Sequence, residues 1–156
     1  MQTAETSVRT SIVVEAPIDQ AFSVFTDGLG SWWPPEYNIL DVDIAERVFE
    51  TRVGGHVYDV GTDGSECHWA RVLAFEPPNR LVISWDLSPQ WQVETDPEKT
   101  SEVEVRFTAE GPNQTSLELE HRNLDRHGEG WEKMRDAVGS PNGWDLRGFA
   151  EAAARA

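Results

Sequence analysis

This 156-residue chain has four histidines. The ordinary pKa of the histidine side chain permits proton transfer near neutral pH. His121 ends an alternating stretch, residues 115–121, in which Leu117, Leu119 and His121 share one face. On that face the imidazole could hydrogen-bond a ligand or act as a general acid–base. The competing interpretation is a core histidine whose hydrogen bonds are all satisfied within the protein. His121 is therefore a candidate site residue with two open interpretations.

His68 is the second candidate, and its orientation depends on the register of the strand expected over residues 66–75. This segment has apolar residues on both faces, so its register is ambiguous. If Ala70 and Val72 face inward, alternation turns Glu66 and His68 inward as well. Together with Tyr58 they would form a polar cluster inside the domain. In the other register they face solvent.

Seven tryptophans against two tyrosines are an unusual aromatic balance. Large aromatic side chains usually anchor a core, and they can equally line a cavity for an aromatic or lipid-like ligand. Trp33 and Trp85 are candidates for such a wall, with Phe107 on the apolar face of a strand. Trp91 lies in a polar, acidic segment, residues 88–101, which we expect to be a long loop and a functional lid.

Other chemistries find little support in the sequence. Cys67 and His68 are neighbours and would point to opposite faces of a strand, so we expect no metal site. The chain has no G-x-S-x-G nucleophile motif and no phosphate-binding glycine loop, and we expect no cofactor. The polar run Arg122, Arg126, His127 and Glu129 indicates an ion-pair network, or else an anchor for a ligand carboxylate.

The elements that would position these residues follow from apolar spacing. The β-branched and alternating segments predict strands, and the i, i+3, i+4 apolar spacings predict helices. We expect strands over residues 7–15, 44–52, 56–60, 65–75, 80–87, 102–109 and 115–121, and helices over 18–25, 130–138 and 143–156.

Strands that run together in the sequence indicate an α+β fold. We expect one domain, residues 1–156, with a curved antiparallel sheet of six to seven strands wrapped around a long C-terminal helix. Short helices would follow the first strand. A space between sheet and helix would suit a small apolar ligand.

Charge and apolar content exclude several partners. Lys and Arg number 13 against 28 Asp and Glu, a net charge of −15, which argues against nucleic acid and anionic membrane surfaces. The sequence has no apolar run long enough to span a membrane, and its single cysteine allows no internal disulfide. We therefore expect a cytoplasmic protein without membrane insertion, and leave a homodimer open.

Several blocks of the sequence resemble a known family. They are Val13-Val14-Glu15-Ala16-Pro17, Trp32-Trp33-Pro34, Trp69-Ala70-Arg71-Val72, Glu76-Pro77-Pro78, Glu118-Leu119-Glu120-His121-Arg122 and Gly143-Trp144. In order and spacing they resemble the START-like (SRPBCC) superfamily, in the branch named after the activator of the heat-shock chaperone ATPase (AHSA). The resemblance covers residues 7–155 and implies a helix-grip fold. That superfamily includes lipid carriers, polyketide cyclases, hydrolytic members and chaperone co-activators, the last being longer proteins.

Together these observations predict a domain that binds an apolar or aromatic small molecule between the sheet and the C-terminal helix. The expected ligand-binding residues are Trp33, Tyr58, His68, Trp85, Trp91, Phe107 and His121. Two alternatives stay open. The first is a cyclase or hydrolase that uses the same cavity, and the second is a chaperone-interacting module, which would need an exposed apolar patch.

Overall fold

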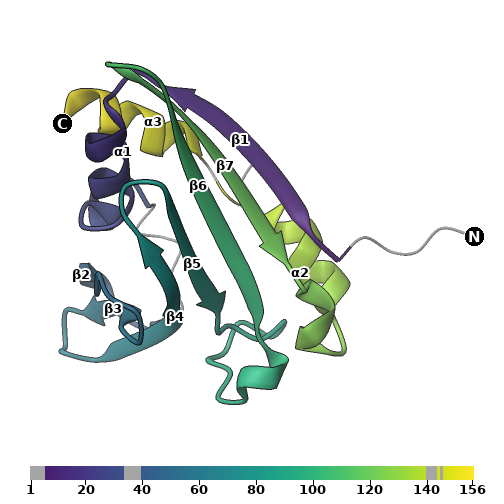
Figure 1. Ribbon diagram of the computed structural model, residues 1–156. Coiled ribbons are helices and arrows are strands. Elements are labelled where there is room, and N and C mark those ends of the chain that lie inside the picture. The colour runs from purple at the N-terminus through teal and green to yellow at the C-terminus, as the bar shows by residue number, and fades with distance from the viewer. Residues whose placement is uncertain (1–5, 34–39, 140–143, 145) are drawn as a thin grey trace, which may run out of the picture.

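The computed structural model describes residues 6–33, 40–139, 144 and 146–156 (Figure 1). Strands dominate the middle of the chain, and helices lie near both ends. The strands are β1 (Val8–Val14), β2 (Ile44–Phe49), β3 (His56–Gly61), β4 (Glu66–Glu76), β5 (Arg80–Trp85), β6 (Ser101–Gly111) and β7 (Gln114–Arg122). The α-helices are α1 (Ile18–Phe25), α2 (Trp131–Val138) and α3 (Leu146–Arg155), with 3-10 turns at Leu29–Ser31, Pro97–Lys99 and Leu124–His127.

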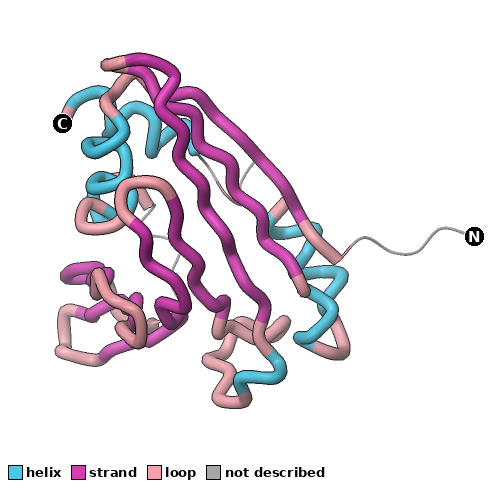
Figure 2. Tube along the Cα trace, in the orientation of Figure 1, coloured by secondary structure: helices cyan, strands magenta, loops and turns pink. Residues whose placement is uncertain are grey.

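All seven strands form one antiparallel sheet in the order β1-β7-β6-β5-β4-β3-β2. Strands β2 to β7 are therefore a simple meander in which each strand pairs with the next one along the chain. Strand β1 joins at the other end, beside β7 (Figure 2). The predicted α+β helix-grip architecture, with six to seven antiparallel strands, is confirmed.

The two faces of β6 and β7 alternate as the sequence predicts. Val103 lies opposite His121 and Phe107 opposite Leu117, and all four side chains are buried on the inner face. Most acidic and basic residues of the same strands point outward to water, and the buried Glu104 pairs there with Arg80 and Arg122. The sheet thus offers one apolar face to the helices.

Helices α1 and α3 share the inner face of the sheet. Ring contacts of Phe22 and Phe25 with Phe107 fix α1 on β6, at centroid distances of 5.1 and 5.7 Å. Phe149 of α3 packs on Phe25 at 5.4 Å and on Trp32 at 5.3 Å. The C-terminal helix is ten residues long, Leu146–Arg155, and is therefore shorter than the predicted 143–156.

A β-bulge changes the register between β3 and β4. Val57 pairs with Ala70 but Tyr58 pairs with His68, so Trp69 is an extra residue on β4. Cys67, Trp69 and Ala70 are consequently all buried, whereas His68 has a 40% exposed side chain. The expectation that side chains alternate strictly along this strand was wrong, because a bulge allows neighbouring residues to share a face. Inward-facing Ala70 therefore does not bring His68 inward.

Candidate functional site

Four tryptophans from four separate segments meet inside the domain. Trp33 contacts Trp69 and Trp144 at ring-centroid distances of 6.3 and 5.0 Å, and Trp85 contacts the same two rings at 5.7 and 5.6 Å. Each of the four rings thus contacts two of the others, and we name this group the tryptophan tetrad. Each member is at most 8% exposed. The tetrad joins the end of the 3-10 turn after α1, strands β4 and β5, and the segment before α3.

His121 borders this tetrad from β7. Its ring centroid lies 5.2 Å from that of Trp85 and 6.2 Å from that of Trp144. The side chain is completely buried. Burial, with a smaller effect of the nearby His127 charge, lowers the pKa of His121 to about 3. The imidazole is therefore neutral at physiological pH.

A chain of hydrogen bonds leads from the tetrad through His121 to His127. Trp144 Nε1 donates to His121 Nδ1 at 3.3 Å. Ser101 Oγ lies 2.7 Å from His121 Nε2 and also 2.7 Å from His127 Nε2. Burial lowers the pKa of His127, although the carboxylates of Glu94 and Asp86 oppose the shift. We name Trp144, His121, Ser101 and His127 the buried relay.

Two buried donors next to the relay have no hydrogen-bond partner among the described residues. They are Trp85 Nε1 and His127 Nδ1. Trp85 is the strand partner of Ser101 across β5 and β6, and His127 bonds to Ser101 directly. Buried polar groups are usually satisfied, so unpaired ones need an explanation. Both therefore mark the surroundings of Ser101 as a place where a ligand could supply an acceptor.

A second buried polar group lies on the other side of the tetrad. Asp59 Oδ1 accepts from Trp69 Nε1 at 3.3 Å and lies 3.4 Å from Arg47 Nε. The side chains of Arg47 and Asp59 are 3% and 2% exposed. Burial raises the pKa of Asp59, while Arg47 and the Trp69 hydrogen bond act in the opposite direction. An ion pair buried this deeply needs both partners.

Tyr58 and His68 lie together, but on the outer face. Their rings stack at a centroid distance of 4.4 Å, and His68 also contacts His56 and Glu66 through its two ring nitrogens, at 3.1 and 2.8 Å. Alternation along β3 turns Asp59 inward and Tyr58 outward. The polar cluster expected from these residues does form, but the bulge at Trp69 puts it on the solvent side of the sheet rather than in the interior.

The remaining candidates lie apart from the tetrad. Phe107 is buried beneath α1, where it contacts Phe22 and Phe25. Trp91 is 42% exposed in the segment between β5 and β6, at a positive φ of 60°. A bridge between Leu87 and Val93 closes the turn that presents it. Of the seven predicted residues, the structure brings together Trp33, Trp85 and His121.

Four residues of the site were not among the sequence candidates. Trp69 and Trp144 complete the tetrad, and Ser101 and His127 complete the relay. The tryptophans carry a signal, since both fall in the family-like blocks. Ser101 carries none, because it is an ordinary serine at the start of a strand. His127 was assigned to a polar run that forms an ion-pair network or anchors a ligand carboxylate, and the structure buries it at the end of the 3-10 turn.

Thiol and metal chemistry gain no support from the described residues. Burial raises the pKa of the Cys67 thiol to about 11, so it stays protonated. Within residues 6–33, 40–139, 144 and 146–156, no group of three or more His, Cys, Asp or Glu side chains is placed to hold a metal ion. In the same part of the chain, no helix combines the length and apolar character needed to cross a membrane.

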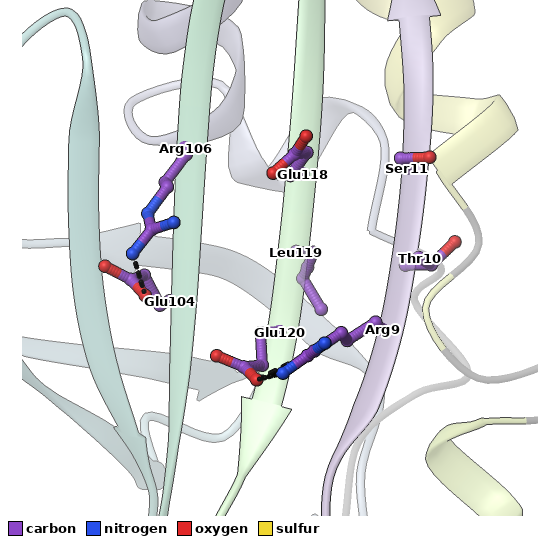
Figure 3. A pocket seen from close by; sticks show the side chains of 8 residues that line it. All are labelled: Arg9, Thr10, Ser11, Glu104, Arg106, Glu118, Leu119 and Glu120. Carbon is purple, nitrogen blue, oxygen red and sulfur yellow. Dashed lines mark hydrogen bonds and ion pairs between the residues drawn. The ribbon is translucent and has the colours of Figure 1, made fainter.

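A separate groove of about 500 Å³ lies on the outer face over β1, β6 and β7 (Figure 3). Its lining is charged: Arg9 pairs with Glu120 at 2.9 Å, and Arg106 pairs with Glu104 at 3.1 Å. The lining has two arginines and three glutamates, the third being Glu118, so its charge is mixed and nearly balanced and gives no strong single-sign field to attract a charged ligand. The interior tetrad and relay are the better candidate site.

Large apolar side chains are exposed at five described positions. These are Val13, Val53, Leu73, Trp91 and Val93. Only Trp91 and Val93 belong to the same loop; Val13 lies on β1, Leu73 on β4, and Val53 in the turn between β2 and β3. The loop between β5 and β6 is therefore where exposed apolar side chains come closest to forming a patch.

A curled antiparallel sheet that grips helices around an aromatic interior defines a helix-grip domain of the START-like superfamily. The family model described as "Activator of Hsp90 ATPase homolog 1-like protein" matches residues 15–145, so the chain belongs to that family. The predicted AHSA branch is thereby confirmed.

Solved structures agree with this assignment. An anthrahydroquino-γ-pyrone synthase, Txn09, solved in complex with a ligand, is 38% identical, with a TM-score of 0.69 over 94% of this chain and 96% of its own. The self-sacrificing resistance protein CalC from Micromonospora echinospora is 29% identical, with a TM-score of 0.70 over 97% and 96%. Protein NE0264 from Nitrosomonas europaea, 15% identical, shares the fold with a TM-score of 0.69 over 99% and 98%.

No curated protein sequence matches the chain. The family and the two more similar structures support a ligand-binding domain in general terms.

Proposed function

We propose that the protein binds a planar aromatic small molecule of the polyketide type against the tryptophan tetrad. The observation that carries this proposal is the tetrad itself, bordered by the neutral imidazole of His121. Indole faces stack on flat aromatic ligands, and ligand sites combine such apolar walls with a few fixed polar groups. Trp85 Nε1 and His127 Nδ1 are polar groups of this kind.

The similar structures support the same ligand class. Txn09 is an anthrahydroquino-γ-pyrone synthase, and it is 38% identical to this chain over 94% of this chain's length. A flat polycyclic ligand with oxygen substituents would suit the tetrad and the two unpaired donors. Function still depends on the site rather than the fold, so a direct binding experiment is needed.

The test is a titration with 9,10-anthraquinone-2-sulfonate, followed by the seven indole N–H signals in a ¹H–¹⁵N NMR spectrum. We expect saturable shifts of the Trp33, Trp69, Trp85 and Trp144 signals. Trp131 is an internal control, because it contacts Arg135 on α2 outside the tetrad. An absence of saturable shifts at the tetrad, with this compound and with hydroxylated anthraquinones, would refute the proposal.

Trp91 is proposed as a gate to the site, since it is an exposed aromatic on the loop between β5 and β6. Replacing Trp91 by Ala should weaken binding of the anthraquinone roughly threefold to tenfold, the usual worth of one aromatic contact. The matched variant Trp131→Ala should leave the dissociation constant unchanged. Equal effects of the two variants, measured by isothermal titration calorimetry, would remove Trp91 from the site.

An enzyme that acts on such a ligand is the second candidate, favoured by the 38% identity with a synthase and by the buried relay. Two N–H donors can stabilise the negative charge that develops on a carbonyl oxygen during an addition reaction. Incubation with an anthraquinone that carries an unclosed polyketide side chain tests this. A new isomer or a dehydrated product by liquid chromatography and mass spectrometry, absent with Trp85→Phe, supports an enzyme. If the substrate binds but is not converted, the enzyme hypothesis is refuted and the binding function remains.

A further inference from the structure

The buried relay has a fixed direction, which follows from its first member. The indole Nε1 of Trp144 can only donate a hydrogen bond, so His121 Nδ1 must accept it. A neutral imidazole has one N–H, which in His121 is then on Nε2. The low pKa of His121 agrees with this neutral state.

The direction continues through Ser101. Its hydroxyl has one proton and receives the N–H of His121 Nε2 at 2.7 Å. The remaining hydroxyl proton is then available to His127 Nε2, which lies 2.7 Å from the same oxygen. His127 Nε2 therefore accepts, and a neutral His127 carries its proton on Nδ1.

His127 Nδ1 is the free end of this chain. It is buried and has no partner among the described residues, and the same holds for Trp85 Nε1. Both side chains are 5% exposed. Since both groups next to Ser101 are donors, an oxygen acceptor with free lone pairs would satisfy either of them.

We propose that His127 Nδ1 and Trp85 Nε1 recognise a carbonyl or phenolate oxygen of the aromatic ligand, and that Trp144, His121 and Ser101 hold His127 in its donating tautomer. This inference rests on the proposed function and names the group that the site selects. Trp144 acts here as a positioning residue. If every hydrogen bond of the relay ran in the opposite direction, an N–H of His121 would face the N–H of Trp144, and the two donors would repel. His127 Nδ1 therefore donates to the ligand and does not act as a base.

The selectivity follows from the same geometry. An aromatic hydrocarbon can contact the indole faces, but it leaves both donors unsatisfied. A ligand that presents an amine or another donor would oppose them. A quinone or a phenolate supplies the missing acceptor and keeps the flat ring for the tetrad.

The first experiment requires no ligand. Long-range ¹H–¹⁵N correlation spectra of the histidine rings report which nitrogen is protonated. We expect the Nε2–H tautomer for His121 and the Nδ1–H tautomer for His127. In Trp144→Phe the donor is gone, so both rings should lose their single tautomer. An Nε2–H tautomer of His127 in the unaltered protein would overturn the relay, whatever the ligand experiments give.

The second experiment compares 9,10-anthraquinone-2-sulfonate with anthracene-2-sulfonate, which lacks only the two carbonyl oxygens. We expect the quinone to bind about tenfold more tightly, since each recovered hydrogen bond contributes up to about tenfold. Trp85→Phe keeps an aromatic ring and removes one donor, so it should reduce this preference several-fold. Trp131→Phe is the matched control and should keep it.

The outcomes separate the two levels of the argument. Equal affinity of the two compounds overturns this inference and leaves aromatic binding intact. Binding of neither compound overturns the proposed function together with the inference. A quinone preference that persists unchanged in Trp85→Phe and in Ser101→Ala, with circular dichroism spectra like that of the unaltered protein, removes both donors from the recognition of oxygen.

Discussion

His121 ties the stability of the domain to pH through its burial. Its pKa is about 3 in the folded state and about 6.5 when unfolded, so between these values the unfolded chain binds the extra proton. Stability is therefore fully present above pH 6.5 and declines as the pH falls below it. Lowering the pH from 7.5 to 5 should cost about 2 kcal/mol from this residue alone.

Urea unfolding at both pH values measures this cost. His121→Gln retains a polar side chain that does not titrate, so its stability should change less between pH 7.5 and 5 than that of the unaltered protein. His68→Gln removes a 40% exposed imidazole and is the matched control, which should keep the full dependence. An identical pH dependence in His121→Gln would contradict the burial argument.

The Arg47–Asp59 pair should behave as a coupled unit. Replacing Asp59 by Asn removes the negative charge that faces a guanidinium only 3% exposed, and we expect a loss of about 3 kcal/mol. The double variant Arg47→Met with Asp59→Asn should be no less stable than the single Asp59 variant, because it buries no charge at this place. Chemical denaturation of the unaltered protein, the single variants Asp59→Asn and Arg47→Met, and the double variant completes the cycle.

An exposed pair provides the control for that cycle. Arg9, with a 78% exposed side chain, pairs with Glu120 on the outer face. Arg9→Met should change stability by at most about 0.5 kcal/mol, since solvent-exposed ion pairs contribute little. Additive effects of the Arg47 and Asp59 substitutions would mean that the two side chains do not interact.

At the scale of single residues, the sequence predicted three residues that the structure places in the tetrad or the relay, and it missed others. His121, Trp33 and Trp85 were predicted from strand alternation and from the high tryptophan content, both of which can be recognised in the sequence alone. His68 could not be oriented, since one extra residue at Trp69 reverses every side chain beyond it. Ser101 and His127 interact across 26 positions of the chain, a proximity that no local pattern contains.

Among the elements, α3 is attached to the domain through its packing on β1 and α1. Its Phe149 is fully buried and packs on rings of α1 and of Trp32. Phe149→Ala should cost about 3–4 kcal/mol, as large-to-small substitutions at buried aromatic positions do. Ala154→Ser, on the exposed side of the same helix, should cost about 0.5 kcal/mol or less.

Thermal and urea denaturation followed by circular dichroism compares these two variants. If Phe149→Ala lost less than about 1 kcal/mol, α3 would not be docked as described. The same variant also disturbs the neighbours of the tetrad, because Trp32 contacts both Phe149 and Trp33. Indole N–H shifts at Trp33 would then report how far the change extends.

The elements themselves were largely foreseeable. Strands β6 and β7 have a two-residue apolar period that matches a half-buried sheet, and α1 has the spacing of Ile18, Phe22 and Phe25 on one face. The length of α3 was overestimated because helix propensity at a chain end does not say where packing stops. The long loop was correct in place, but its Leu87–Val93 bridge and 3-10 turn depend on backbone pairing that composition does not encode.

At the scale of the whole molecule, the tetrad is assembled from segments that only the complete fold brings together. Trp33 and Trp144 are 111 positions apart, yet their rings are 5.0 Å apart. The polar outer face and the aromatic interior therefore have different origins. The polar outer face follows from the alternating residues of each strand, whereas the aromatic interior forms only after the sheet and the helices have packed.

The sheet order has a consequence for the pathway by which the chain folds. Strands β2 to β7 pair with their neighbours along the chain, so most of the sheet can form through short loop closures. Pairing of Val14 with Thr115 closes a loop of about 100 residues and belongs late on the pathway. In stopped-flow measurements, Val14→Ala should accelerate unfolding with a φ-value near 0, whereas Val105→Ala should slow folding with a φ-value above about 0.5. The reverse order would show that β1 nucleates the sheet.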